Sequence, residues 1–145
     1  MKKVIVMFLV LIALAGCSLR SFSKENQTPS TGKIVVDKAE YEMMGGQYKW
    51  NGENVEIQRV DHVSPIEIAK EFDTLILEKN KKIDILIEKN PSLTVYQWTE
   101  DGSVKEVTLT DNQITAPSNN GYYIYEVVGK WLDGEASYIF DIEVE

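Results

Sequence analysis

The chain has 145 residues, and its 23 acidic side chains outnumber 15 basic ones, which gives a net charge of −8 at pH 7. Nucleic acids and anionic lipid surfaces attract clustered lysine and arginine, so this balance argues against either as an electrostatic partner. The single cysteine excludes an internal disulfide, and the single histidine makes a zinc site or a histidine-based catalytic set hard to assemble.

The first 16 residues differ in composition from the rest. Lys2 and Lys3 precede an unbroken apolar run from Val4 to Ala15. This order of positive charge, apolar run and small residues is typical of a secretory signal peptide. The run is shorter than the roughly 20 residues that a membrane-spanning helix needs, although an uncleaved membrane anchor is the alternative. We expect residues 1–16 to be a signal peptide.

The stretch Leu14-Ala15-Gly16-Cys17 closes this leader and resembles the lipobox of bacterial lipoproteins. The resemblance implies diacylglyceryl transfer to the Cys17 thiol, cleavage before Cys17, and a lipid anchor on the extracytoplasmic face of the cell membrane. Two acyl chains, at about 0.8 kcal/mol per buried methylene, hold more firmly than one. Loss of the leader removes two lysines and shifts the net charge to about −10, so the lipid has to do the anchoring.

Residues 17–32 are predicted to carry the lipid and then form a flexible tether. The stretch from Ser18 to Gly32 is polar, rich in Ser and Thr, and has no sustained period, which is typical of a linker. Residues 33–145 suit one domain, without internal repeats.

Most of this domain reads as short strands separated by turn residues. The strongest alternation lies in 82–88, where Ile83, Ile85 and Ile87 share a face, and in 136–144, where Tyr138, Phe140, Ile142 and Val144 share one. Gly45-Gly46 is interpreted as a turn or a bulge within 41–50. The predicted strands are 33–37, 41–50 in two pieces, 54–60, 74–77, 82–88, 93–99, 104–110, 122–131 and 136–144.

One helix is predicted near residues 64–72. Ser64 is a good N-cap, Pro65 suits the first helical position, and Glu67 completes a capping box. Ile68, Ala69 and Phe72 then fall on one face. A single helix among many strands predicts a mainly β sandwich or barrel.

The stretch Gly121-Tyr122-Tyr123-Ile124-Tyr125 resembles the start of the penultimate strand of immunoglobulin-like domains. The resemblance implies an antiparallel β-sandwich in which Tyr123 is the corner tyrosine, whose hydroxyl bonds to nearby backbone. The cysteine pair of antibody domains is missing. The whole chain is similar to small Gram-positive (Bacillus-type) lipoproteins with one immunoglobulin-like domain, a group that implies a fold and a location but no reaction.

Catalytic and metal sites are weakly indicated. His62 has no Gly-x-Ser-x-Gly elbow to serve, so an envelope hydrolase or metal-dependent enzyme that uses His62 with nearby acids is the minor alternative. Calcium is a second alternative, although no Asp-x-Asp-x-Asp-Gly loop is present. Its candidate ligands are Glu100, Asp101, Asp111, Asp133, Glu135, Asp141 and Glu143. We predict no enzyme activity, no cofactor and no resident metal.

Aromatic residues carry the remaining hypothesis. Neighbouring residues of a strand point to opposite faces, so Tyr122 and Tyr123 cannot both be buried in one core. Trp50, Trp98 and Tyr122 are the candidates for an interaction surface that would meet a partner or a glycan, since exposed Trp and Tyr mark interfaces. The competing interpretation places the tryptophans in the core. The sequence therefore predicts a membrane-anchored, non-catalytic binding module with a protein or cell-wall partner.

Overall fold

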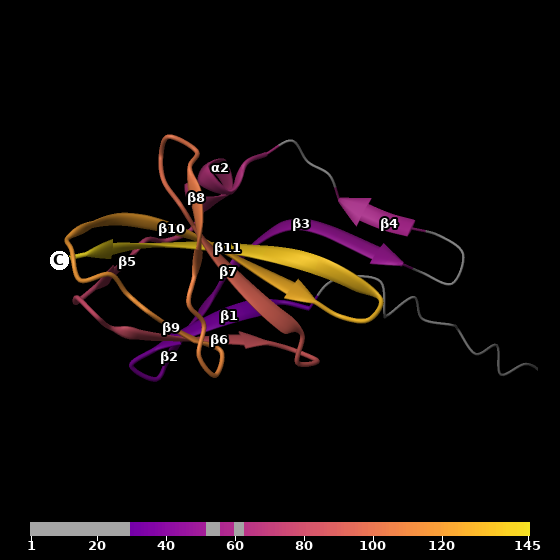
Figure 1. The fold of residues 1–145 in the computed structure, drawn as a ribbon, viewed down its shortest axis with the longest axis horizontal. Helices are drawn as coiled ribbons and strands as arrows, with labels where there is room; N and C mark the ends of the chain where they lie inside the picture. Colours follow the sequence, from indigo (N-terminus) through magenta and orange to yellow (C-terminus); the bar gives the residue numbers. More distant parts are fainter. Residues whose placement is uncertain (1–29, 52–55, 60–62) are drawn as a thin grey trace, which may run out of the picture.

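The computed structural model describes residues 30–51, the backbone of 56–59, and residues 63–145. The predicted signal peptide, Cys17, most of the tether, the Asn51-Gly52 turn beyond Asn51, and His62 lie outside the described residues. Within them the protein is mainly β, with largely antiparallel sheets and a single short helix (Figure 1). That arrangement is consistent with the predicted sandwich.

A four-stranded sheet, here called the small sheet, has the order β2-β1-β6-β9 and is antiparallel throughout. Its strands are β1 (Gly32–Val36), β2 (Ala39–Glu42), β6 (Lys82–Ile87) and β9 (Gln113–Thr115). The β1–β2 hairpin was not predicted. Its turn uses Asp37 and Lys38, both with positive φ, a conformation for which the sequence signal is usually glycine or asparagine.

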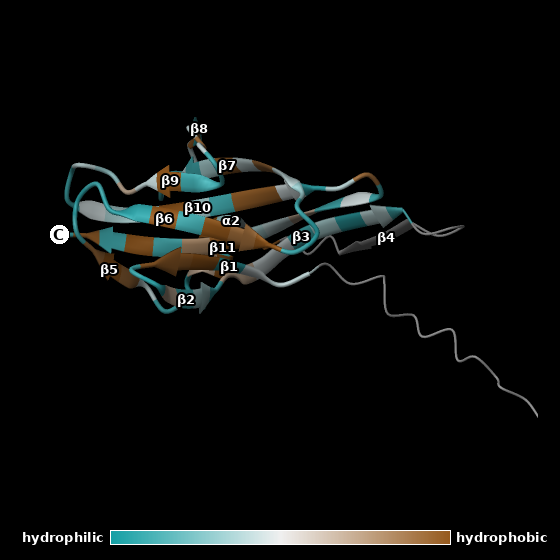
Figure 2. Ribbon diagram, turned by 90° about the horizontal axis from the view of Figure 1, so that it is seen from below, coloured by the Kyte–Doolittle hydropathy of each residue, from teal (hydrophilic) through white to brown (hydrophobic). Residues whose placement is uncertain are grey.

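A seven-stranded sheet, the large sheet, has the order β4-β3-β11-β10-β7-β8, and β5 pairs in parallel with the end of β11. Its strands are β3 (Met44–Asn51), β4 (Glu56–Arg59), β5 (Leu75–Leu77), β7 (Ser92–Trp98), β8 (Val104–Val107), β10 (Gly121–Lys130) and β11 (Gly134–Val144). Figure 2 shows β10 and β11 running along the length of the molecule.

Gly45-Gly46 lies at a β-bulge and not at a turn, so one of the two predicted alternatives is confirmed. The β3–β11 register shifts between Ala136 and Tyr138, which leaves Gly46 and Gln47 opposite Ser137. The Gln47 amide donates to the Ser137 hydroxyl over 3.0 Å. A Cβ at Gly46 would lie 2.2 Å from that hydroxyl, so the bulge has no room for a larger residue.

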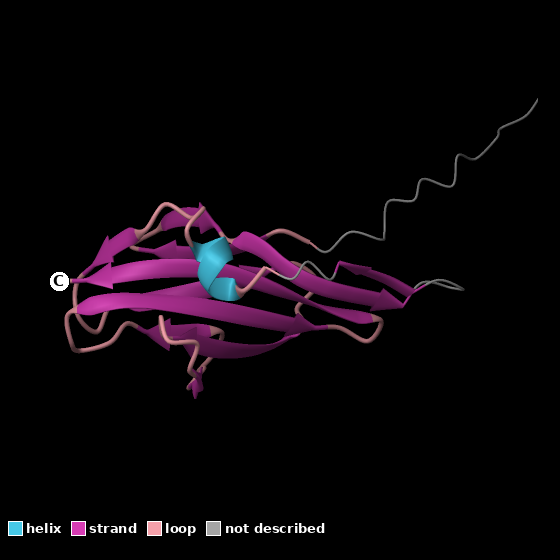
Figure 3. Ribbon diagram, turned by 90° about the horizontal axis from the view of Figure 1, so that it is seen from above, coloured by secondary structure: helices cyan, strands magenta, loops and turns pink. Residues whose placement is uncertain are grey.

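The helix, α2 (Pro65–Ala69), lies on the face of the large sheet that is turned away from the small sheet (Figure 3). The predicted capping box is present: the Ser64 side chain accepts from the Glu67 amide, and the Glu67 side chain accepts from the Ser64 amide. The helix ends at Ala69, earlier than the predicted Phe72, because Phe72 packs edge-on against Phe140 in the core instead. Among the described residues no helix is long and apolar enough to cross a membrane.

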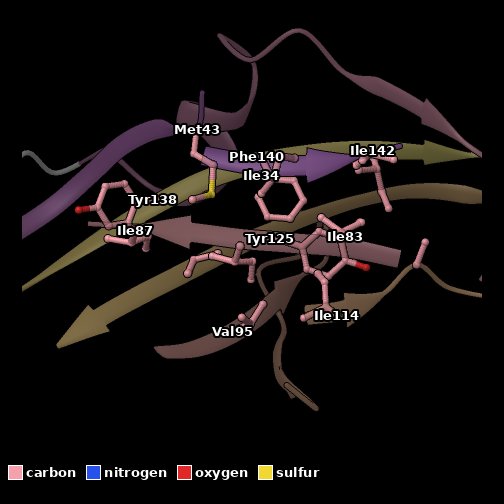
Figure 4. Close-up of a cluster of buried hydrophobic side chains, with 14 of the residues drawn as sticks. Ile34, Met43, Ile83, Ile87, Val95, Ile114, Tyr125, Tyr138, Phe140 and Ile142 are labelled. Carbon is pink, nitrogen blue, oxygen red and sulfur yellow. The ribbon is translucent and has the colours of Figure 1, made fainter. Parts of the chain in front are cut away.

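The main core lies between the two sheets (Figure 4). The predicted inward residues of β6 and β11 are buried there, as the alternation indicated. Phe140 is fully buried and stacks on Tyr125, with ring centroids 5.1 Å apart. We call the side of the large sheet that meets the small sheet its inner face, and the side that carries α2 its outer face.

Candidate functional site: an aromatic outer face

Two of the three predicted surface residues lie together on the outer face of the large sheet. Trp98 pairs with Ile124, and Tyr122 lies two residues before Ile124 on β10, so both side chains leave the same face. Tyr96 and Val104 share this face, because Val104 pairs with Trp98 across the β7–β8 hairpin. We call Tyr96, Trp98, Val104 and Tyr122 the aromatic face.

The aromatic face is accessible. Val104 is 51% exposed and Tyr122 is 38% exposed, while Tyr96 and Trp98 are half-buried. Sequence reasoning missed Tyr96 and Val104. The signal was present, since a turn at Asp101-Gly102 implies that Trp98 and Val104 face each other across a hairpin.

Trp98 is held in place by a polar and an apolar contact. Its indole Nε1 donates to Glu126 Oε2 over 3.0 Å. The ring also packs against a second cluster under α2 that contains Ala69, Ile124 and Ile139. The indole is therefore fixed in one orientation before any partner arrives, which lowers the entropy that binding would cost.

Tyr122 covers a buried carboxyl group. Its hydroxyl donates to Asp141 Oδ2, and Asp141 is only 1% exposed. Burial raises the pKa of Asp141, although the Tyr122 and Thr74 hydroxyls favour its charged form. Burial, followed by the bond to Asp141, raises the pKa of Tyr122 far above its ordinary value. Asp141 Oδ1 lacks a partner with normal hydrogen-bond geometry among the described residues.

Trp50 does not join the aromatic face, so this part of the predicted surface is wrong. Trp50 is buried and packs against Trp131, with ring centroids 5.2 Å apart. A Cβ at Gly134 would lie 2.6 Å from the Trp50 ring, so the missing side chain at Gly134 gives the indole its space. For Trp50 the competing interpretation, a core tryptophan, is the correct one.

Tyr123 points to the opposite side of β10 from Tyr122 and packs against the main core, as alternation predicted. Its hydroxyl donates to the Asn119 carbonyl over 2.9 Å. This is the bond to nearby backbone that the resemblance of Gly121–Tyr125 implied for Tyr123. The bond between Tyr123 and Asn119 holds the loop before β10 in place, and so helps to position Tyr122 at the start of that strand.

The candidate calcium ligands do not gather at one end of the sheets. Asp101 lies in the β7–β8 turn, near the start of β10, whereas Glu135 pairs with Lys130 at the other end of that strand. Asp101 accepts from the Thr99 hydroxyl and the Ser103 amide, which lower its pKa to about 2. Within the described part of the chain, no three His, Cys, Asp or Glu residues form a group that could hold a metal ion.

Comparison of the chain with protein-family models, curated proteins and solved structures gives no match. The aromatic face therefore has to be interpreted from its own geometry.

Proposed function

We propose that the protein is a lipid-anchored extracytoplasmic lipoprotein whose β domain is a non-catalytic binding module that meets a protein partner through the aromatic face. The observation that carries the proposal is the placement of Trp98 and Tyr122 on one accessible face, each fixed by a hydrogen bond to a carboxylate. Trp and Tyr held in this way are typical anchors of protein interfaces.

The position of β8 favours a protein as the partner. Because β8 ends the strand order of the large sheet, one side of its backbone faces no described strand. Such an edge can pair with an extended segment of another chain. Val104 lies on β8 and belongs to the aromatic face, so a partner strand that pairs with β8 would also contact Trp98.

The immunoglobulin-like fold and the kinship with small Gram-positive lipoproteins are part of the same proposal. The Tyr123–Asn119 bond and the closing β10–β11 hairpin support the fold. The lipobox-like stretch that ends at Cys17 supports the anchor, and the net charge of −8 leaves an acidic domain that needs one.

The anchor is tested by Cys17→Ala in cells. This variant should lose labelling by a radioactive fatty acid and accumulate with its leader uncleaved, because the thiol that takes the lipid is gone. Ser18→Ala is the matched control and should be processed normally. Normal processing and membrane retention of Cys17→Ala would refute the lipid anchor.

The partner surface is tested by a photo-cross-linking amino acid placed in the full-length chain in cells. Position 104, on the aromatic face, is compared with position 86, on the outer side of β6, because Val104 and Leu86 are 51% and 50% exposed. We expect a discrete, protease-sensitive product from position 104 and none from position 86. Equal products at both positions, or a product that contains only a second copy of this chain, would overturn the proposal.

A further inference from the structure

A groove lies on the other side of the β7–β8 hairpin from the aromatic face. Here the small sheet ends in β9 and the large sheet ends in β8, and between them lies a groove of about 790 Å³. We call it the edge groove. In Figure 2, β7, β8 and β9 lie on the same side of the molecule. Its volume falls within the roughly 300–1,000 Å³ that is typical of ligand sites.

The floor of the edge groove contains two polar side chains that are almost fully buried. Gln97 and Tyr125 pair across β7 and β10 and are 8% and 1% exposed. Both line the groove, and neither side chain has a buried, unpaired polar atom, so the Gln97 amide and the Tyr125 hydroxyl open onto the groove and are not sealed in the core. In Figure 4 the Tyr125 hydroxyl points away from Phe140.

Polar groups that open from a largely buried floor onto a groove can bind a ligand that enters it. Burial raises the pKa of Tyr125 well above its ordinary value, so the group stays a hydroxyl that can donate and accept. The Gln97 amide also offers both donors and an acceptor. Such a floor suits a ligand that presents many hydroxyl groups.

The rim of the groove adds positive charge from both sheets. Lys82 enters from β6 and Lys105 from β8, and both are exposed. Lys82 Nζ donates to Thr115 Oγ1 over 2.6 Å. Within the described part of the chain neither lysine forms a salt bridge. Glu106 also lines the groove and offsets one of these charges, so the lining carries two positive charges and one negative charge. In a chain with a net charge of −8, this local excess of positive charge favours a negatively charged ligand.

We propose that the edge groove binds a hydroxyl-rich chain that carries negative charge, either an acidic glycan with carboxylate groups or a polyol polymer with phosphate groups. Gln97 and Tyr125 bind hydroxyl groups at the floor, and Lys82 and Lys105 bind the anionic groups at the rim. The site is independent of the aromatic face, since Gln97 and Trp98 leave opposite sides of β7.

The test is calorimetric titration of the purified full-length lipoprotein in detergent with three probes of similar length: a neutral chitooligosaccharide, an oligogalacturonate and an oligomer of glycerol phosphate. We expect one charged probe to bind at least about tenfold more tightly than the neutral one, a difference of about 1.4 kcal/mol. The tighter charged probe identifies carboxylate or phosphate as the recognised group. Added salt should weaken this binding.

Variants localise the binding. Lys82→Gln combined with Lys105→Gln should reduce the affinity for the charged probe to that for the neutral one, and Gln97→Glu should weaken it by adding a negative charge at the floor. Lys130→Gln removes the same charge at the far end of β10 and should leave binding unchanged. Absence of binding to both charged probes by the folded chain, or equal loss in Lys130→Gln, would overturn the proposal without affecting the aromatic face.

Discussion

The inner and outer faces of β10 and β11 are made by the same two strands but are covered in different ways. On the inner face, the small sheet covers Phe140 and the ring of Tyr125 in an apolar and aromatic core, and only its edge, where Gln97 and Tyr125 line the edge groove, is polar. On the outer face, Ile124 and Ile139 are covered by α2, and Asp141 is buried beside them. The alternation of side chains along a strand determines which residues share a face of the sheet. Segments that are distant in the sequence determine whether that face is buried in an apolar core, buried beside a polar group, or exposed to a partner.

The largest effect is expected on the inner face. Phe140→Ala should lower the free energy of unfolding by about 3–5 kcal/mol, because it removes a buried ring that stacks on Tyr125 and leaves a cavity. Urea unfolding measures the change. Ile76→Ala, at a site 68% exposed on β5, is the control and should stay within about 0.5 kcal/mol of the wild type. A similar loss of unfolding free energy in both variants would contradict the difference between buried and exposed positions.

An intermediate effect on the free energy of unfolding is expected at α2, the helix that covers part of the outer face. Ser64→Ala removes the side chain that accepts from the Glu67 amide, so α2 should lose a cap and unfolding should become easier by about 1 kcal/mol. The matched control is Ser92→Ala, at an exposed position where β7 begins. An unchanged unfolding midpoint in Ser64→Ala would show that the capping box does not stabilise α2 on the outer face.

The smallest effect on stability at any single pH is expected from substitution of Asp141. It should be visible as a change in how the free energy of unfolding depends on pH. Burial raises the pKa of Asp141 in the folded protein above 3.8, so the protonated form is favoured by folding. Its contribution to stability is present in full below pH 3.8 and is lost as the pH rises through the folded value. Asp141→Asn should remove this loss, so the variant gains stability relative to the wild type as the pH rises.

Urea unfolding at a series of pH values measures this difference. Tyr122→Phe is the informative control, because loss of the hydroxyl that favours the carboxylate should move the wild-type loss to higher pH. Parallel stability curves for the wild type and Asp141→Asn would contradict a raised pKa for Asp141.

Local features of the fold could be predicted from the sequence. The capping box at Ser64, the inward residues of β6 and β11, and the opposite orientations of Tyr122 and Tyr123 depend on spacing along one element. Features that depend on contacts between distant segments could not. Asp141 is buried because other segments cover the outer face of the sheet, and the spacing of residues within β11 does not predict this.

The same distinction explains the candidate sites. The aromatic face was partly predictable, because strand alternation puts Tyr122 and Trp98 outside once their partners are known. Trp50 was misplaced because the space for its ring comes from Gly134, which lies 84 positions away along the chain. The edge groove has no sequence signal, since Gln97 and Tyr125 become neighbours only when β7 pairs with β10.

The role of the aromatic face in binding is tested by photo-cross-linking from position 104 in chains that carry Trp98→Ala, with Tyr96→Ala as a second variant on the same face. The folded amount of each chain is first matched by resistance to protease. We expect the partner product seen with the wild-type face to be lost in Trp98→Ala and reduced in Tyr96→Ala. An undiminished product in both variants would contradict the claim that the aromatic face binds the partner.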